Sequence, residues 1–189
     1  MENIYFKKLN IKRDIALDAI AFAASQITDY NAYNRINVTR SDIKRRVHGF
    51  FQNLGFRVSG VICFYTPPNY SLATAHIDDS KFSNMAKLNY VSGGAEHWMH
   101  WYKFVGTEEQ IIKTTNVRGD SYYSFDKEHC EEIAREHMEG YYLVNAGVPH
   151  GITNDSPIGR WCLSFGLHDL MTMERVQWHD ALEMLKDYT

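Results

Sequence analysis

The sequence predicts a mainly β fold with flanking helices, arranged as a jelly roll (a double-stranded β-helix). Short segments rich in β-branched and aromatic residues follow one another between about residues 58 and 167. Helical patterns lie mainly before and after this stretch. Because the strands do not alternate with helices, a doubly wound parallel sheet is disfavoured, and a jelly roll or small barrel fits better.

One continuous domain over residues 1–189 is the simplest organisation. The chain carries no Ser/Gly linker, internal repeat or low-complexity segment. We expect a helical N-terminal part at about residues 1–55, a jelly-roll core at about 58–167 and a C-terminal helix at about 169–188.

Two helices are expected in the N-terminal part. Residues Arg13–Ile27 are rich in alanine, and Ile15 and Ala19 recur one turn apart, which predicts a helix with a buried face. A second helix is predicted over Ser41–Asn53, with Ser41 as its N-cap.

Seven short strands and two later helices complete the prediction. The strands are Val58–Tyr65, Ser71–Ile77, Lys87–Val91, His97–Val105, Tyr141–Asn145, His150–Asn154 and Trp161–Leu167. The first two are expected to form a hairpin or close turn pair across Pro67 and Pro68. A helix is expected over Asp126–Met138, capped by Asp126, and another over Asp169–Tyr188.

The charge balance argues against several classes of partner. The chain has 20 basic and 23 acidic residues, a net charge of -3 and a pI near 6.3. Such a chain has no bulk attraction to duplex nucleic acid or to an anionic membrane. No segment resembles a secretory signal or approaches the ~20 apolar residues of a transmembrane helix. Three cysteines without C-x-x-C spacing argue against disulfides and structural zinc, so we expect a cytoplasmic, reducing location.

Histidine and carboxylate residues are the candidates for chemistry, because phosphate-binding loops, nucleophile elbows and H-E-x-x-H motifs are absent. The pattern H-x-[DE] occurs at His76/Asp78, His129/Glu131 and His137/Glu139. In a strand, residues i and i+2 point to the same side and can chelate a metal, whereas in a helix they diverge. Only His76 and Asp78 lie at the end of a predicted strand, where both side chains can reach one point, so we expect this pair to bind the metal.

His150 is the best candidate for a third ligand, because it opens another predicted strand after a turn at Gly147–Pro149. Two imidazoles and one carboxylate form the facial triad of non-haem Fe(II) oxygenases, which leaves positions open for other ligands. Arg160 follows ten residues later and opens the next strand. Its guanidinium can bind the remote carboxylate of a dicarboxylic acid in a forked geometry.

Three segments together resemble the Fe(II)/2-oxoglutarate-dependent dioxygenases: HID at 76–78, PHGITN at 149–154 and RWCLSF at 160–165. The segment TPPNYSLATAHIDDSKFSNMAKLNYVSGG at 66–94, in which a short alternating strand follows the H-x-D pair, resembles small aspartyl/asparaginyl β-hydroxylase-like and phage or bacterial oxygenases. The resemblance covers about residues 58–167. It implies an enzyme that hydroxylates an amino-acid side chain, a peptide or a small metabolite with O₂ and releases succinate and CO₂.

The resemblance also implies roles for single residues. Fe(II) would be bound by His76, Asp78 and His150, and Arg160 would pair with the C5 carboxylate of 2-oxoglutarate. The superfamily often has a serine two residues after the arginine, but here that position is Cys162, and Ser164 follows two residues later on the same strand face. Asn89 and Tyr90 are further candidates for the co-substrate pocket.

An aromatic and histidine-rich cluster leaves two interpretations open. Trp98, His100 and Tyr102 would line the substrate site or pack in the core, and His100 would alternatively ligate a metal in a cupin-like site. Two rival functions also stay open. One is a cupin-type metal protein or enzyme that does not use 2-oxoglutarate, and the other is a non-catalytic jelly-roll binding protein.

Overall fold

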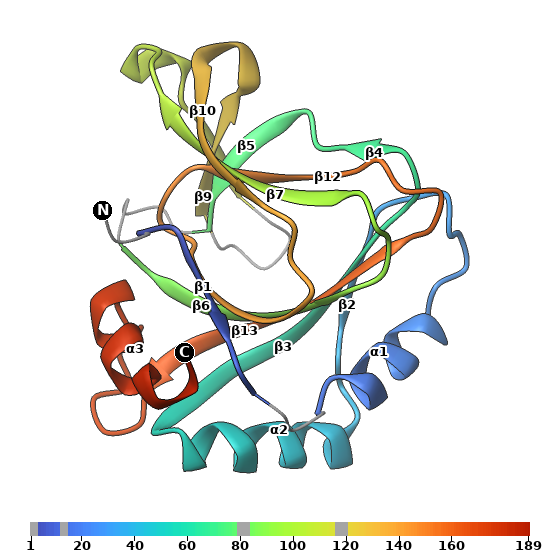
Figure 1. Ribbon diagram of the computed structural model, residues 1–189, viewed down its shortest axis with the longest axis vertical. Coiled ribbons are helices and arrows are strands. Elements are labelled where there is room, and N and C mark those ends of the chain that lie inside the picture. Colours follow the sequence, from blue (N-terminus) through green and yellow to red (C-terminus); the bar gives the residue numbers. More distant parts are fainter. Residues whose placement is uncertain (1–3, 12–14, 79–83, 116–120) are drawn as a thin grey trace.

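Two antiparallel sheets that face each other form the body of the protein in a computed structural model, which describes residues 4–11, 15–78, 84–115 and 121–189 (Figure 1). The first sheet has the strand order β1 (Phe6–Leu9), β11 (Gly140–Asn145), β6 (Ala86–Ser92), β13 (Arg160–Asp169), β3 (Phe56–Thr66) and β2 (Asn34–Asn37). The second has the order β10 (Cys130–Glu136), β7 (His97–Phe104), β12 (His150–Asn154), β5 (Thr74–Ile77), β9 (Ser121–Asp126) and β8 (Ile112–Thr115), with β4 (Tyr70–Ser71) paired to β12.

The strand pairing is nested in the way that defines a jelly roll. Counting inward from the two ends of the core, β3 pairs with β13, β5 with β12, β6 with β11 and β7 with β10. These four pairs alternate between the two sheets, so a long folded hairpin wraps into a double-stranded β-helix. The innermost hairpin, β8 with β9, stays in the second sheet. The predicted fold class, mainly β with flanking helices, is confirmed.

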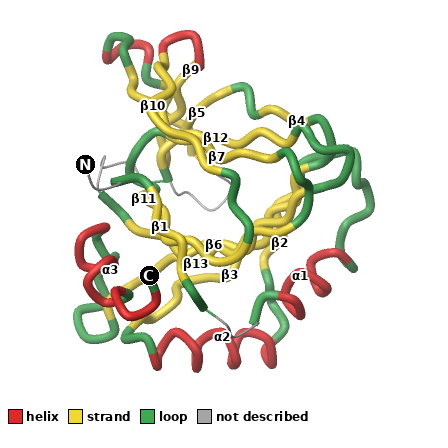
Figure 2. The backbone as a smooth tube through the Cα atoms, in the orientation of Figure 1, coloured by secondary structure: helices red, strands yellow, loops and turns green. Residues whose placement is uncertain are grey.

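The helices cover the outer face of the first sheet (Figure 2). They are α1 (Leu17–Ala24), α2 (Ser41–Asn53) and α3 (Trp178–Met184), with short 3-10 turns at Glu108–Gln110, Lys127–His129 and Lys186–Tyr188. On this outer side α2 buries Val47 and Phe51, and the Phe51 ring lies 4.7 Å from that of Phe165 in β13. The helix over Ser41–Asn53 is confirmed, but its N-cap is Arg40 and not Ser41 as predicted. The first helix begins at Leu17, and residues 12–14 lie outside the described ranges.

A second apolar cluster fills the space between the two sheets. It includes Val91 from β6, Trp101 from β7, Tyr142 from β11 and Cys162 from β13. Alternate residues of one strand therefore enter different cores: Cys162 faces the interior between the sheets, and Leu163 faces the helices. This parity decides which side chains can reach a site inside the jelly roll.

The predicted helix over Asp126–Met138 is wrong. Residues Lys127–His129 form a 3-10 turn, and Cys130–Glu136 form the edge strand β10, which pairs with β7 through a bulge beside Ile133. Glutamate and alanine favour helices, but pairing with β7 overrides this propensity. Because β10 lies at the sheet edge, its charged side chains also reach solvent.

Other boundaries differ from the prediction for topological reasons. The hairpin between Val58–Tyr65 and Ser71–Ile77 is wrong, because β3 and β5 belong to opposite sheets. The C-terminal helix is limited to Trp178–Met184, since the preceding residues form a turn that returns to β13 through the hydrogen bond from Val176 N to Leu167 O. The prediction also missed four strands: β1, β2, β8 and β9.

Two glycines make the turn from β6 to β7 possible. Gly93 and Gly94 have φ angles of 93° and 72°, in the left-handed region that glycine adopts at little cost. A Cβ atom on Gly93 would lie 2.6 Å from the Gly159 carbonyl oxygen, so the turn packs directly against the start of β13.

The three cysteines are free thiols. None of the described helices is long and apolar enough to cross a membrane.

Candidate metal centre

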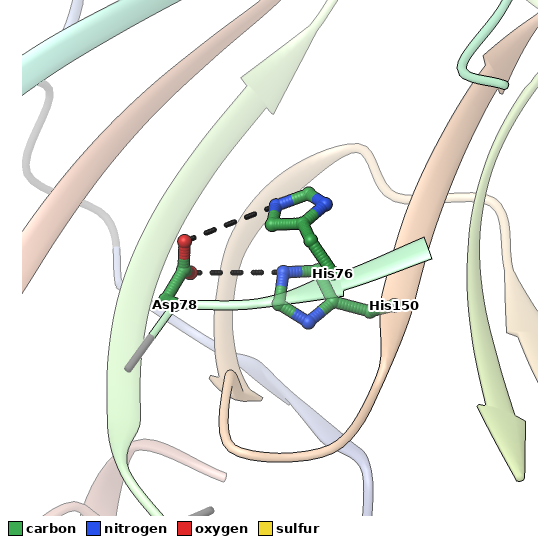
Figure 3. Close-up of side chains that lie close together, drawn as sticks. All are labelled: His76, Asp78 and His150. Atoms are coloured by element: carbon green, nitrogen blue, oxygen red, sulfur yellow. Dashed lines mark ion pairs between the residues drawn. The ribbon is translucent and has the colours of Figure 1, made fainter. Parts of the chain in front are cut away.

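His76, Asp78 and His150 point toward one another inside the jelly roll (Figure 3). Their candidate ligand atoms all lie within 4.8 Å of one another. The Nε2 atom of His76 is 3.8 Å from Asp78 Oδ1, and the Nε2 atom of His150 is 3.6 Å from Asp78 Oδ2. The structure therefore brings together the three residues that the sequence predicted as ligands.

Strand pairing explains this convergence. His76 in β5 and His150 in β12 are direct cross-strand partners, and their ring centroids are 4.5 Å apart. Asp78 follows β5 and lies two residues beyond His76, so it turns to the same side. Ala75 and Ile77 pack on the other side of the strand in a small apolar cluster, which fixes the face that His76 presents.

The backbone sets the tautomer of His150. Its Nδ1 atom lies 2.8 Å from the Val148 carbonyl oxygen, which can only accept a hydrogen bond. Nδ1 therefore carries the proton and donates it, and the Nε2 lone pair faces Asp78. A histidine oriented in this way is ready to bind a metal through Nε2.

Burial keeps both histidines neutral. Desolvation, with a further contribution from the neighbouring His150, lowers the pKa of His76 to about 4, and desolvation also lowers the pKa of His150. For Asp78, desolvation acts to raise the pKa, but Lys87, His150 and His76 outweigh it and hold the pKa below its usual range. Neutral imidazoles beside an ionised carboxylate are the protonation states that metal binding requires.

Lys87 is a site residue that the sequence analysis missed. Its Nζ atom lies 2.7 Å from Asp78 Oδ2, and both side chains are about a quarter exposed. Lys87 comes from β6 in the opposite sheet, so this ion pair crosses the interior. The only signal in the sequence was the alternation of β6, which puts Lys87, Asn89 and Val91 on one face.

Arg160 is almost completely buried, with 1% of its surface exposed. Its Nε atom has no hydrogen-bond partner, and no carboxylate pairs with its guanidinium in the part of the chain that the structure describes. A buried cation without a counter-ion is unfavourable, so this arrangement suits an anionic ligand.

Arg160 and the three candidate ligands lie in the same interior environment. The pKa of the Cys162 thiol is raised by burial, and it also responds to the charges of Arg160, Lys87 and Asp78. Asn89 and Ser164 are direct cross-strand partners in β6 and β13, and they lie on the same strand faces as Lys87 and Cys162. Both are buried, and the Asn89 Oδ1 atom has no hydrogen-bond partner.

Tyr90 does not face this interior, so its predicted place in the co-substrate pocket is wrong. It lies on the opposite face of β6 from Asn89 and packs against the helix-side core. Its ring centroid is 4.8 Å from that of Tyr141, its cross-strand partner in β11. The error arose because adjacent residues of a strand were assigned to one site.

The predicted substrate wall of Trp98, His100 and Tyr102 is also wrong. These residues alternate in β7 with Met99 and Trp101, which belong to the interior cluster, so they lie on the outer face of the second sheet. His100 does not join a metal group: its Nδ1 is 2.7 Å from Glu132 Oε2, and its Nε2 is 3.0 Å from Thr153 Oγ1.

The two remaining H-x-[DE] pairs do not join the site either, although the helix used to exclude them is absent. His129 contacts Gln110, with 3.0 Å between its Nε2 and the Gln110 Nε2. The His137 ring packs 4.5 Å from that of His97. Among the described residues, only His76, Asp78 and His150 form a group suited to a metal ion.

Comparisons with known proteins identify no family. No protein-family model matches the chain, and a search of curated proteins finds no significant match. Among solved structures, a prolyl-4-hydroxylase from Pseudomonas putida is 12% identical, with a TM-score of 0.42, over 85% of this chain and 89% of that one. Peruvianin-I, a cysteine peptidase from Thevetia peruviana latex, is 14% identical, with a TM-score of 0.36, over 74% of this chain and 64% of the peptidase. The functional argument therefore depends on the geometry of the site.

Proposed function

We propose that the protein is an Fe(II)- and 2-oxoglutarate-dependent oxygenase. It would hydroxylate an amino-acid side chain, a peptide or a small metabolite and release succinate and CO₂. The observation that carries this proposal is the combination of the His76–Asp78–His150 group with a buried Arg160 that pairs with no carboxylate in the described chain.

The donor set fits Fe(II). Two neutral imidazoles and one carboxylate are the ligands of facial-triad iron sites, and three protein ligands leave coordination positions for other molecules. With bonds of about 2.1 Å, two ligands at a right angle are about 3 Å apart. His76 Nε2 lies 3.8 Å from Asp78 Oδ1, and His150 Nε2 lies 3.6 Å from the other carboxylate oxygen, Oδ2. Both distances exceed this spacing by less than about 1 Å, so small side-chain movements would bring the three ligands onto one metal ion.

Each residue would have a distinct role. His76, Asp78 and His150 would hold Fe(II), which supplies O₂ activation coupled to oxidation of 2-oxoglutarate. Arg160 would bind the carboxylate of 2-oxoglutarate that lies away from the metal, where its planar guanidinium can donate two parallel hydrogen bonds. Asn89 and Ser164 would contact the co-substrate from the same side of the interior.

Lys87 would act on the metal ligand itself. Its ammonium donates to Asp78 Oδ2 at 2.7 Å, which leaves Oδ1 as the oxygen free to bind the metal. Asp78 would therefore hold the metal through Oδ1, while Lys87 keeps Oδ2 engaged.

An anaerobic titration of the metal-free protein with Fe(II) and then with 2-oxoglutarate tests the proposal. Chelation of 2-oxoglutarate to ferrous iron gives a visible metal-to-ligand charge-transfer band. We expect the band to vanish in His150→Ala and to weaken in Arg160→Leu. His179→Ala and Arg45→Leu are matched controls, because both side chains are exposed and far from the site in the sequence.

Each alternative result supports a different function. Metal binding without the band would refute the use of 2-oxoglutarate and favour a cupin-type metal protein. No metal binding would leave a non-catalytic jelly-roll protein. A positive band would justify a search for substrates by mass spectrometry, with succinate release as the readout for amino acids, peptides and small metabolites.

A further inference from the structure

A second buried polar atom without a partner lies beside Arg160. Thr66 is the direct cross-strand partner of Arg160 in the pairing of β3 with β13. Its side chain is completely buried, and its Oγ1 atom has no hydrogen-bond partner among the described residues. Burying a hydroxyl without a partner is unfavourable, and Arg160 Nε adds a second unpartnered group at the same place.

Strand parity places the Thr66 side chain in the interior. Two residues earlier, Phe64 packs against the interior cluster opposite Cys162. Cys63 and Tyr65, the residues between, are on the other face, where Cys63 belongs to the helix-side core. Thr66 and Arg160 are therefore neighbours on the face that also carries Cys162.

The Thr66 backbone carbonyl accepts a hydrogen bond, although the Thr66 hydroxyl has no hydrogen-bond partner among the described residues. The side-chain amide of Asn154 in β12 donates to the Thr66 and Pro67 carbonyl oxygens at 3.4 and 2.9 Å. It also donates to the Ile158 carbonyl oxygen at 3.0 Å. These hydrogen bonds join the end of β3 to the turn before β13. They therefore hold the backbone that carries Thr66 close to the backbone that carries Arg160.

The neighbouring thiol cannot supply a comparable donor. Cys162, two residues after Arg160 on the same strand face, presents a thiol to this interior. A thiol is a weak hydrogen-bond donor. A carboxylate bound by the Arg160 guanidinium would therefore find the Thr66 hydroxyl as a strong neutral donor on the directly paired position of β3.

We propose that the Thr66 hydroxyl binds the remote carboxylate of 2-oxoglutarate together with Arg160. This inference rests on the proposed function. It assigns to β3, which carries no motif, a residue that selects dicarboxylates over monocarboxylates. A hydroxyl that donates to a carboxylate makes a charge-assisted hydrogen bond, which is stronger than one between neutral groups.

The test compares Thr66→Val, which has the same shape without the hydroxyl, with Thr66→Ser, which retains it. Binding is measured by calorimetry on the Mn(II)-loaded protein, once with 2-oxoglutarate and once with 2-oxopentanoate, which lacks the remote carboxylate. We expect Thr66→Val to weaken 2-oxoglutarate binding about tenfold, as for loss of one charge-assisted hydrogen bond, and to leave 2-oxopentanoate unaffected. Thr66→Ser should stay within about threefold of wild type for both ligands.

Three results would overturn the inference. Equal weakening of both ligands would show that Thr66 only supports the structure, and unchanged 2-oxoglutarate binding would show that its hydroxyl does not touch the ligand. Marked destabilisation of the ligand-free Thr66→Val protein would show that the hydroxyl has a partner within the fold. Failure of wild type to bind 2-oxoglutarate would instead refute the proposed function, so the two failures are distinguishable.

Discussion

Acidification of the metal-free protein should reduce its stability, and His76 should account for a measurable share of the loss. Burial lowers the pKa of this histidine from 6.5 to about 4 in the folded state. The unfolded chain takes up a proton as the pH falls through 6.5, whereas the folded protein does so only near pH 4. The contribution of His76 to the free energy of unfolding is therefore fully present above pH 6.5 and is lost progressively between pH 6.5 and about pH 4.

The size of the loss follows from the shift. One pKa unit corresponds to about 1.4 kcal/mol, so His76 alone should remove about 3 kcal/mol over the full range. Burial lowers the pKa of His150 and His97 as well, so these residues add to the loss in the same direction. Asp78 acts outside this window, because its pKa is lowered from 3.8 and its contribution is lost only at more acidic pH.

Urea unfolding followed by tryptophan fluorescence, between pH 7 and pH 4.5 in the presence of a chelator, measures this loss. His76→Gln removes the titrating group, so its unfolding free energy should fall by about 2.5 kcal/mol less than that of wild type over this interval. His179→Gln, at an exposed position, serves as the matched control and should behave as wild type. An equal fall in wild type and His76→Gln would refute the argument that burial keeps His76 neutral.

Three further predictions concern the metal, the turn between the sheets and the outer face. Lys87→Met should tighten Mn(II) binding about tenfold in a calorimetric titration, because an ammonium 2.7 Å from Asp78 competes with the metal for that carboxylate; weaker binding would contradict this competition. Gly93→Ala should lower the free energy of unfolding by at least about 2 kcal/mol in thermal unfolding, since it combines a positive φ with a clash against Gly159. Gly140→Ala is the matched control: its φ is 94° but its Cβ would meet open space, so it should lower the free energy of unfolding by only about 1 kcal/mol. Trp98→Ala should leave metal and 2-oxoglutarate dissociation constants within about twofold of wild type, because the side chain lies outside the jelly roll; a larger change would place Trp98 at the site.

The metal-binding candidates could be predicted from the sequence because their geometry is local. In the segment His76–Asp78, an i, i+2 pair in a strand converges whatever the rest of the fold does. His150 followed from its position after a turn and before a strand. The pairing of β5 with β12, which brings the two imidazole ring centroids to 4.5 Å, was not predicted, because the sequence analysis paired Ser71–Ile77 with Val58–Tyr65 instead.

Errors arose where the face of a strand or its pairing depends on distant residues. Tyr90 and Asn89 are adjacent in β6, but only the pleat and the neighbouring strands decide which of them faces the interior. The segment Cys130–Glu136 has a helical composition and becomes a strand because β7 offers an edge to pair with. Lys87 could not be assigned because its partner, Asp78, lies across the interior in the other sheet.

The charges inside the jelly roll indicate that the metal and the co-substrate should bind cooperatively. Among the described residues that face this space, Lys87 and Arg160 are cations and Asp78 is the only carboxylate assigned to the site. A divalent metal would add two positive charges to an environment that already has an excess of cations, which opposes its binding. A dicarboxylate such as 2-oxoglutarate would bring two negative charges, one beside the metal and one beside Arg160. The dicarboxylate would therefore reduce the repulsion that the metal meets, and the metal would give one of the two carboxylates a positive partner. By linkage, each ligand would increase the affinity of the protein for the other.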